Sequence, residues 1–516
     1  MSVQPTTRDS AATAAPATKV PGGPATKVPG GPAPADPGQD TGSGAGLSSG
    51  QIGTFDLVFF VVAAAAPLTV LAGVAPFAIS IGGAGTPLGY LISGALLVLF
   101  AAGFTAMSLY VRNAGAFYAY VARGLGRTLG VGIAYVAVVS YNLITPGVAA
   151  AFGYFAAGSI HDATGADIPW WSLSGVCVLA VGVLGWLRVT LSAKVLGVAL
   201  VLEVLTLLVM DGGILGHRGT AALDMQSFDP GTLATGGVAG MFVIVIGAFT
   251  GFEATAIYAE EAREPSKTVP RATFIAIGFL ALFYSAGVWL VMGAFGTDKA
   301  VAMARAAAGP ELTFKAGELY VGAWLADTMH ALVVISAFAA TLAFHNAAAR
   351  YLYALGREGL LPRRLGAVSA RHGSPGTAVT AQTVFNLLVI VVGAVLAADP
   401  FAQVLIWTNS IAVLGIMLMQ ALAALAVWAF FRRDRRGLSA ARVVWSPLIA
   451  FAGLALLTVL AALHFDLLTG ASWTVNAILL APLPIVLVAG MAIALRIRSR
   501  DPQRYARLTN VDVERD

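Results

Sequence analysis

Long apolar segments, separated by short stretches rich in charged residues, glycine and proline, follow one another along the chain from Phe55 onward. A helix that crosses the hydrocarbon core of a membrane needs about 20 predominantly apolar residues. The segments that meet this length are 55–81, 86–110, 127–158, 170–187, 192–213, 236–258, 272–296, 324–352, 376–397, 402–430, 444–465 and 473–496. The pattern therefore predicts an all-α integral membrane protein with twelve transmembrane helices.

Two of these segments contain residues that interrupt a helix. The first contains Pro67, Gly73 and Pro76, and the sixth contains Gly247 and Gly251. Proline removes a main-chain donor, and main-chain groups freed in hydrocarbon are costly unless protein or ligand satisfies them. Either interruption alone is equally well explained as a bend that helps packing, because Pro and Gly are common in membrane helices. Their occurrence at the first and sixth spans favours discontinuous helices at a transporter binding site.

Composition agrees with this pattern. Of the 516 residues, 58% are hydrophobic and only 11% are charged, against about 25% charged in soluble domains. The mean hydropathy is +0.81. The one cysteine, Cys177, lies inside an apolar segment, so no intrachain disulfide is possible and a buried packing role is favoured. The composition excludes a soluble globular protein.

The chain has a net charge of +5, and its basic residues are distributed unequally between the two sides of the predicted membrane topology. With both termini in the cytoplasm, the outer side holds only Arg218, Lys299, Arg305 and Lys315 of the 31 lysines and arginines. Cationic loops stay on the cytoplasmic side of a membrane, so the asymmetry predicts a multi-pass protein of the cell membrane with both termini inside. Inner cations are suited to contact anionic membrane lipid. The basic balance is a topology signal, and no nucleic-acid partner is predicted.

The chain also divides into domains by composition. Residues 1–52 are rich in Ala, Pro, Gly and Ser and contain PATKVPGG twice in tandem, which is typical of a disordered tail. The membrane domain is predicted over 53–498, and 499–516 form a second cytoplasmic tail.

Two carboxylic acids lie inside predicted spans. Glu253 follows Gly251 by two positions, and Glu203 lies between Lys194 and Asp211, near mid-membrane at about 1.5 Å per residue. A charged side chain at the bilayer centre costs about 2.5–3.5 kcal/mol on insertion scales, so both acids are candidate functional residues for proton or cation coupling. The alternatives are a helix-break stabiliser at Glu253 and a protonated acid bonded to a neighbouring helix at Glu203.

Other side chains inside the spans are weaker candidates. Those that are suited to line a cavity are Tyr141, Asn142, Trp407, Thr408 and Asn409, although hydrogen bonding between helices explains each of them as well. Phe249 and Phe252 flank Gly251. One of them is a candidate aromatic gate over a ligand, and packing explains it equally well.

Several stretches resemble those of a known family. They are GAGTPLGYLISGALLVLFAAGFTAMS with RNAGAFYAYVARGLG, then GAFTGFEATAIYAEEAREPSKTVPRA, and HNAAARYLYALGREGLLP. On these stretches the chain resembles the amino acid–polyamine–organocation (APC) superfamily, in its bacterial amino acid permease branch, over about residues 55–430. The resemblance implies alternating access and a five-plus-five inverted repeat with discontinuous helices 1 and 6. Repeat one would cover about 55–213, repeat two about 236–430, and two extra helices about 444–496.

The resemblance also implies a central site where the carboxylate and ammonium of the ligand meet the unwound parts of spans one and six. The first span departs from the family's Gly-Ser-Gly type of break, because PLTVLAGVAP contains only Gly73, and the carboxylate-binding amides are expected near Ala72–Val74. The candidate substrate-binding residues are Thr69, Ala72, Gly73, Val74, Asn142, Gly247, Phe249, Thr250, Gly251 and Trp407.

The candidate coupling residues are Glu203 and Glu253. Relatives similar to arginine/agmatine antiporters also have an acid near Glu253, where it is linked to proton-dependent gating. Several proton-coupled members carry a lysine in the part of the fifth span that here contains Glu203, and its ammonium stands in for sodium. The resemblance therefore leaves both proton and sodium open as the coupling ion.

We expect a secondary active transporter that moves amino acids across the cytoplasmic membrane by proton-coupled symport or exchange. A polyamine or amine importer of the same superfamily is the alternative, favoured by the two buried acids. A membrane enzyme or a sensor is less favoured, because the sequence contains no HExxH, GxSxG, P-loop or Gly-rich dinucleotide motif. No cofactor and no metal site is predicted, and no sequence feature indicates an oligomeric state.

Overall fold

The computed structural model describes residues 53–111, 117–187, 193–234, 236–253, 255, 262–307, 311–369 and 373–508. By its internal contacts the chain divides into Met1–Gly46 and Leu47–Asp516, and every described residue belongs to the second unit. The predicted tail at 1–52 and the end of the tail at 499–516 lie outside the described residues. The domain boundaries therefore stay predictions.

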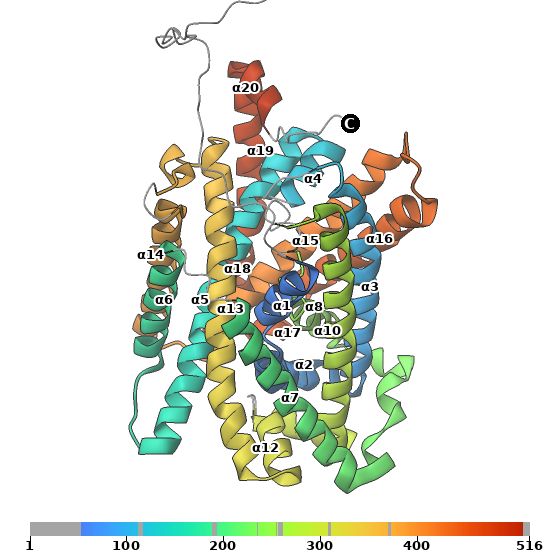
Figure 1. The fold of residues 1–516 in the computed structure, drawn as a ribbon, viewed down its shortest axis with the longest axis vertical. Helices are drawn as coiled ribbons and strands as arrows, with labels where there is room; N and C mark the ends of the chain where they lie inside the picture. The colour runs from blue at the N-terminus through green and yellow to red at the C-terminus, as the bar shows by residue number, and fades with distance from the viewer. Residues whose placement is uncertain are drawn as a thin grey trace, which may run out of the picture. The chain divides into compact units, whose positions relative to one another are not determined.

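The elements of regular structure in these ranges are all helices (Figure 1). The letter α marks an α-helix, and η marks a π- or 3-10 helix. The first half contains α1 (Thr54–Ala65), η1 (Thr69–Val74), α2 (Ala75–Gly82), η2 (Gly83–Gly85), α3 (Thr86–Met107), α4 (Phe117–Gly124), α5 (Arg127–Thr164), α6 (Trp170–Trp186), α7 (Ala193–Arg218), η3 (Gly219–Ala222), η4 (Met225–Phe228) and η5 (Pro230–Leu233). The second half contains α8 (Val238–Gly247), α10 (Pro265–Phe295), α11 (Thr297–Ala307), α12 (Glu311–Tyr320), α13 (Ala323–Arg357), η6 (Arg363–Gly366), α14 (Gly376–Val395), η7 (Pro400–Leu405), α15 (Ile406–Phe431), η8 (Ala441–Trp445), α16 (Ser446–Leu463), α17 (Asp466–Thr469), α18 (Trp473–Leu480), α19 (Pro482–Arg500) and α20 (Pro502–Arg507).

Helices predominate because a helix satisfies its own main-chain groups where no water is present. In the described part of the chain, nine helical stretches are long and apolar enough to cross a membrane, and α6 and α8 are shorter apolar helices. The first stretch, Thr54–Met107, is 54 residues long and contains the first predicted span and most of the second. The protein is thus an all-helical, multi-pass membrane protein. The count of twelve spans and the inverted repeat stay predictions.

The first predicted span is interrupted at Ala66. This position is closer to the start of the span than Gly73, near which the sequence analysis expected the main-chain amides that bind the substrate. Ala66 has the left-handed dihedral angles φ 47° and ψ 70°, and Pro67 has no N–H to continue the helix. The helix resumes at Pro67 and continues into the π-helix η1. There the carbonyl of Leu71 accepts the Thr313 hydroxyl of α12 at 2.7 Å. The missing proline donor, and not the flexibility of Gly73, therefore locates the break.

The sixth predicted span is interrupted where α8 ends at Gly247. At ten residues, α8 is about 15 Å long, half of the roughly 30 Å hydrocarbon core. Turns follow as far as Glu253, and Gly251 within them has φ 117°, which L side chains rarely adopt. A Cβ atom at Gly247 would lie 2.9 Å from the Val413 side chain of α15, so glycine permits this close approach.

Both interrupted spans lie inside the helix bundle. In Figure 1, α1, α2 and α8 lie in the middle of the view, among the longer α3, α5, α10 and α13. The short α1 contacts α7, α10 and α13, and α8 contacts α2, α3 and α15. Small residues bring the helices close: a Cβ atom at Gly490 of α19 would lie 2.8 Å from Gly132 of α5. The bundle therefore holds the ends of α1 and α8 against protein.

Candidate functional site

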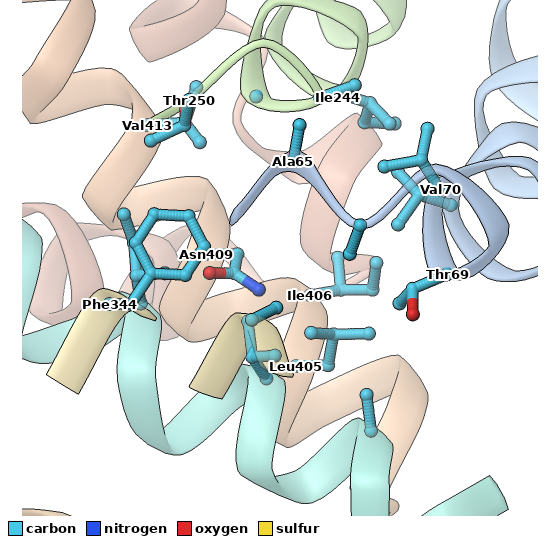
Figure 2. Close-up of a pocket in the computed structure, with 18 of the residues that line it drawn as sticks. Ala65, Thr69, Val70, Ile244, Thr250, Phe344, Leu405, Ile406, Asn409 and Val413 are labelled. Atoms are coloured by element: carbon cyan, nitrogen blue, oxygen red, sulfur yellow. The ribbon is translucent and has the colours of Figure 1, made fainter. Parts of the chain in front are cut away.

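A cavity of about 110 Å³ lies between the ends of the two interrupted spans (Figure 2). The end of α1 contributes Ala64 and Ala65 to its wall, the break contributes Ala66, and the end of α8 contributes Gly247. Further walls come from η1, α5, α13 and α15. The cavity therefore joins the two places where main-chain groups are released from regular helix.

Four neutral residues supply the polar side chains of the wall, namely Thr69, Thr250, Asn409 and Ser410. The Thr69 hydroxyl is buried and has no hydrogen-bond partner among the described residues. Buried polar groups are normally paired, so this hydroxyl is a group that a ligand can bind. Thr69 also lies in the first turn of the helix that resumes after Pro67, where the helix dipole is positive.

Glu203 of α7 contacts the break in the first span directly. Its side chain is 3% exposed. Its Oε2 atom accepts the Leu68 main-chain N–H at 3.3 Å and the Ser336 hydroxyl of α13 at 2.9 Å. In a continuous helix the Leu68 N–H would donate to the carbonyl four residues earlier, that of Ala64. Glu203 therefore takes the donor that would carry the helix across the break.

Glu253 has the same relationship to the break in the sixth span. It is fully buried, and its Oε2 atom accepts the Gly251 main-chain N–H at 3.0 Å. Its Oε1 atom accepts the Tyr141 hydroxyl of α5 at 2.6 Å. The Tyr141 ring stacks on Tyr351 of α13, with centroids 4.7 Å apart and planes 18° apart. Glu253 thus connects the turn after α8 to two long helices.

Each intramembrane acid therefore accepts a main-chain N–H at one of the two breaks. Hydrogen bonds with an ionised partner are about twice as strong as neutral ones. A change in the protonation of either acid would change how firmly the neighbouring break is held. Neither carboxyl group lines the cavity. The two acids therefore act on the helix breaks, whose main-chain N–H groups they accept.

Several of the predicted substrate-binding residues come together at the cavity. Thr69, Val74, Gly247 and Thr250 line it. Gly251 lies close by, since a Cβ atom there would be 3.2 Å from that of Ala64, which also lines the cavity.

Two predicted residues of the first span lie outside the cavity wall in this structure. Ala72 is fully buried. A Cβ atom at Gly73 would meet the rings of Phe155 and Phe401, each at 3.4 Å. Because the break lies at Ala66, these residues belong to the resumed helix, and their binding role stays a prediction.

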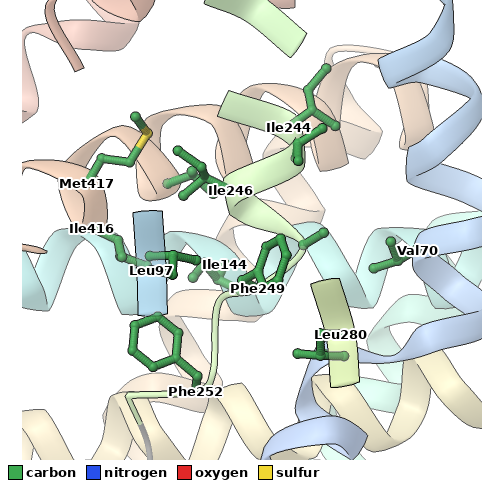
Figure 3. Packing of buried hydrophobic residues seen from close by; sticks show 14 of the residues in the cluster. Val70, Leu97, Ile144, Ile244, Ile246, Phe249, Phe252, Leu280, Ile416 and Met417 are labelled. Atoms are coloured by element: carbon green, nitrogen blue, oxygen red, sulfur yellow. The ribbon is translucent and has the colours of Figure 1, made fainter. Parts of the chain in front are cut away.

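The remaining predicted residues are engaged elsewhere. Phe249 is buried in the hydrophobic core (Figure 3). Its ring packs edge-on against that of Tyr284. Asn142 donates to a main-chain carbonyl one turn earlier in α5, at 2.7 Å. Trp407 donates its indole N–H to the Thr469 carbonyl at 3.1 Å. The structure does not bring these three side chains to the cavity wall.

The cavity wall also contains residues that the sequence analysis did not select, among them Ile144, Phe344 and Val413. Val413 follows Asn409 by four residues, so the two lie on the same face of the helix. Because Asn409 was a candidate for the cavity wall, this spacing could have identified Val413 as a further candidate. Ile144 and Phe344 are apolar residues in apolar spans. Nothing in the sequence distinguishes them from residues that face lipid.

The fold and the site together define a class: a multi-pass membrane protein with two discontinuous helices at the wall of a cavity. In the described ranges, no group of three or more His, Cys, Asp or Glu side chains is placed to hold a metal ion. The amino acid permease family model matches residues 56–504, and the chain belongs to this family. The resemblance stated from sequence is confirmed, and the family is one of transporters rather than enzymes.

Parts of the chain are also similar to individual transporters. The chain is 28% identical to an uncharacterized transporter of Mycobacterium tuberculosis, over 49% of this chain and 54% of the relative. It is 25% identical to the branched-chain amino acid permease BcaP of Bacillus subtilis, over 44% of this chain and 46% of the relative. It is 23% identical to the histidine permease HisP of Lactococcus lactis, over 60% of this chain and 66% of the relative. The matched part spans about half the length of the first of these relatives.

Proposed function

We propose that this chain is a secondary active transporter that moves amino acids across the cytoplasmic membrane by alternating access. The observation that supports this function is the cavity enclosed by the ends of α1 and α8. Membership of the amino acid permease family supports an amino acid as the substrate. Relatives named as branched-chain amino acid and histidine permeases support it further.

The two charged groups of an amino acid match the two kinds of helix end at this cavity. The helix that resumes after Pro67 offers a positive N-terminal turn and the Thr69 hydroxyl to the carboxylate. The C-terminal end of α1 offers the Ala64 carbonyl to the ammonium, because the Leu68 N–H that would bind it in a continuous helix donates to Glu203 instead. The end of α8 adds the Gly247 carbonyl, which accepts one hydrogen bond from the Thr250 N–H and has a second lone pair for the ligand. In this proposal the main chain holds the zwitterion, and the rest of the wall receives its side chain.

The proposed coupling ion is a proton, carried by Glu203 or Glu253, with sodium as the alternative. Each acid is buried and holds a main-chain N–H at a break. Protonation removes the charge and weakens that hydrogen bond, so proton binding would loosen the break where the substrate binds. This relationship would link proton movement to the opening of the site.

The proposal includes a topology with both termini in the cytoplasm and an inverted repeat. The distribution of lysine and arginine supports the orientation, because only Arg218, Lys299, Arg305 and Lys315 fall on the predicted outer side. The interruptions in the first and sixth spans support the repeat. Labelling of cysteines introduced at Lys299 and Arg435 in a Cys177→Ser background, from outside intact cells, tests the orientation. Lys299→Cys should react and Arg435→Cys should not.

Counterflow in proteoliposomes tests the transport function. Purified protein is reconstituted in liposomes loaded with an unlabelled amino acid mixture, and uptake of labelled amino acids is followed. We expect saturable accumulation that excess unlabelled amino acid abolishes and that liposomes without protein do not show. Folded protein that shows no counterflow of any common amino acid would contradict the proposal.

A further inference from the structure

The chemistry of the cavity wall indicates a substrate class, an inference that rests on the proposed function. No Asp, Glu, Lys, Arg or His side chain lines the cavity within the part of the chain that the structure describes. Apart from Thr69, Thr250, Asn409 and Ser410, the wall consists of Ala, Gly, Val, Ile, Leu and Phe. A ligand group that enters this space beyond the helix ends meets an almost entirely apolar surface.

The two intramembrane acids, which would favour an amine substrate, do not change this surface. Glu203 is directed at the Leu68 N–H and at Ser336. Glu253 is directed at the Gly251 N–H and at Tyr141. A guanidinium group or a second ammonium group in the cavity would therefore be buried without an opposite charge. Burial of an unpaired charge is far more costly than burial of an apolar group.

We infer that the transporter selects neutral amino acids with aliphatic side chains, represented by valine and isoleucine, over cationic amino acids and polyamines. The helix ends bind the charged groups common to all amino acids. The aliphatic side chain contacts the apolar wall, which includes Ile144 and Val148 of α5. Phe344 of α13, labelled in Figure 2, belongs to the same wall.

Parallel counterflow of labelled isoleucine, arginine and putrescine in the same liposomes tests this selectivity. We expect isoleucine to exceed arginine by roughly a hundredfold at equal low concentration, and putrescine to give no counterflow. Counterflow of arginine equal to or above that of isoleucine overturns the substrate class but supports amino acid transport. Absence of counterflow for every amino acid contradicts the proposed function itself, so the two failures are distinguishable.

A variant that narrows the cavity tests whether this wall sets the selectivity. Ala340 of α13 lines the cavity, and its neighbour Ala339 is also buried but does not line it. We expect Ala340→Val to lower the ratio of isoleucine to alanine transport about tenfold, because one or two added methyl groups in an apolar pocket have effects of this size. The control Ala339→Val should leave the ratio unchanged.

Alanine transport serves as the internal measure of folding for these variants. An Ala340→Val protein that transports alanine with an unchanged isoleucine ratio overturns the assignment. Should Ala340→Val fail to fold, Phe344→Ala provides the opposite test. Enlarging the cavity should raise transport of phenylalanine relative to alanine about tenfold, and an unchanged ratio there overturns the assignment as well.

Discussion

The Leu68 main-chain N–H donates to Oε2 of Glu203 across 3.3 Å, so a side chain of α7 takes the donor that would continue the first span past Pro67. The two residues are 135 positions apart in sequence. Glu253 and Gly251 form the corresponding hydrogen bond in the sixth span, at 3.0 Å. Both helix breaks are thus held by a carboxyl group within the membrane, and this arrangement leads to the predictions below.

Replacement of Glu203 by Leu is expected to lower the free energy of unfolding by about 1–3 kcal/mol, since the buried Leu68 N–H and Ser336 hydroxyl would lose their acceptor. Glu203→Gln keeps an acceptor oxygen and should lose less. The midpoint of thermal unfolding in detergent measures both effects. Ser336→Ala, which leaves the Leu68 hydrogen bond in place, is the matched control. A Glu203→Leu protein as stable as the parent would show that the acid does not hold the break.

Glu253→Gln is expected to reduce uptake driven by a pH gradient more than counterflow. An amide cannot bind and release a proton, but it can still accept the Gly251 N–H. Uptake with and without an imposed gradient, in the same liposomes, measures the difference. Tyr141→Phe is the control, since it removes the donor to Glu253 but keeps the ring on Tyr351. Equal loss of both activities at normal expression would assign Glu253 to architecture.

Thr69→Val is expected to weaken substrate binding about tenfold without loss of stability. The two side chains are similar in shape, and the Thr69 hydroxyl has no partner to lose among the described residues. One hydrogen bond to a charged group such as the substrate carboxylate is worth at least about 1.5 kcal/mol, and 1.4 kcal/mol is tenfold. Competition binding gives the affinity. Thr313→Val should instead lower the free energy of unfolding by about 1 kcal/mol and leave the affinity unchanged. The reason is that the Thr313 hydroxyl donates to the Leu71 carbonyl and not to the ligand. Unchanged affinity in Thr69→Val would remove Thr69 from the site.

Gly251→Ala is expected to destabilise the protein by about 1–3 kcal/mol, because φ at this position is 117°. The added Cβ atom would also lie 3.2 Å from that of Ala64. Gly278→Ala is the matched control: Gly278 lies inside α10, and a Cβ atom there meets nothing within 4 Å. That change should stabilise the helix by roughly 0.5–1 kcal/mol. Thermal unfolding of the two variants should therefore shift in opposite directions, and a shift of the same sign would contradict the strained turn.

The sequence led to the broken spans more reliably than to the residues within them. Pro67, Gly73 and Pro76 all appear as possible interruptions, and only the structure shows that the helix ends before Pro67. The missing N–H of a proline can be read from the sequence at that residue alone. Where the helix opens depends also on which group accepts the main-chain N–H of the next residue. For Leu68 that neighbour is Glu203, on another helix.

The acids show the same division. Glu203 and Glu253 stand out in sequence because a carboxylate is unexpected in hydrocarbon. Their partners are harder to find: Tyr141 was selected as a residue that lines a cavity or bonds between helices, but nothing in the sequence pairs it with Glu253, 112 positions away. Residue type identified the unusual groups, and only packing identified what they hold.

The sequence by itself determined that this protein is helical, crosses the membrane several times and belongs to the amino acid permease family. Lipid imposes length and apolarity on each span separately, and these properties can be read along one segment. The tertiary structure alone decided which apolar residues enclose the cavity. Ile144 and Phe344 face the cavity and Val391 and Leu396 are exposed, yet all four are equally apolar. Contact with lipid and contact with an apolar ligand require the same side chains, so only the arrangement of helices separates the two.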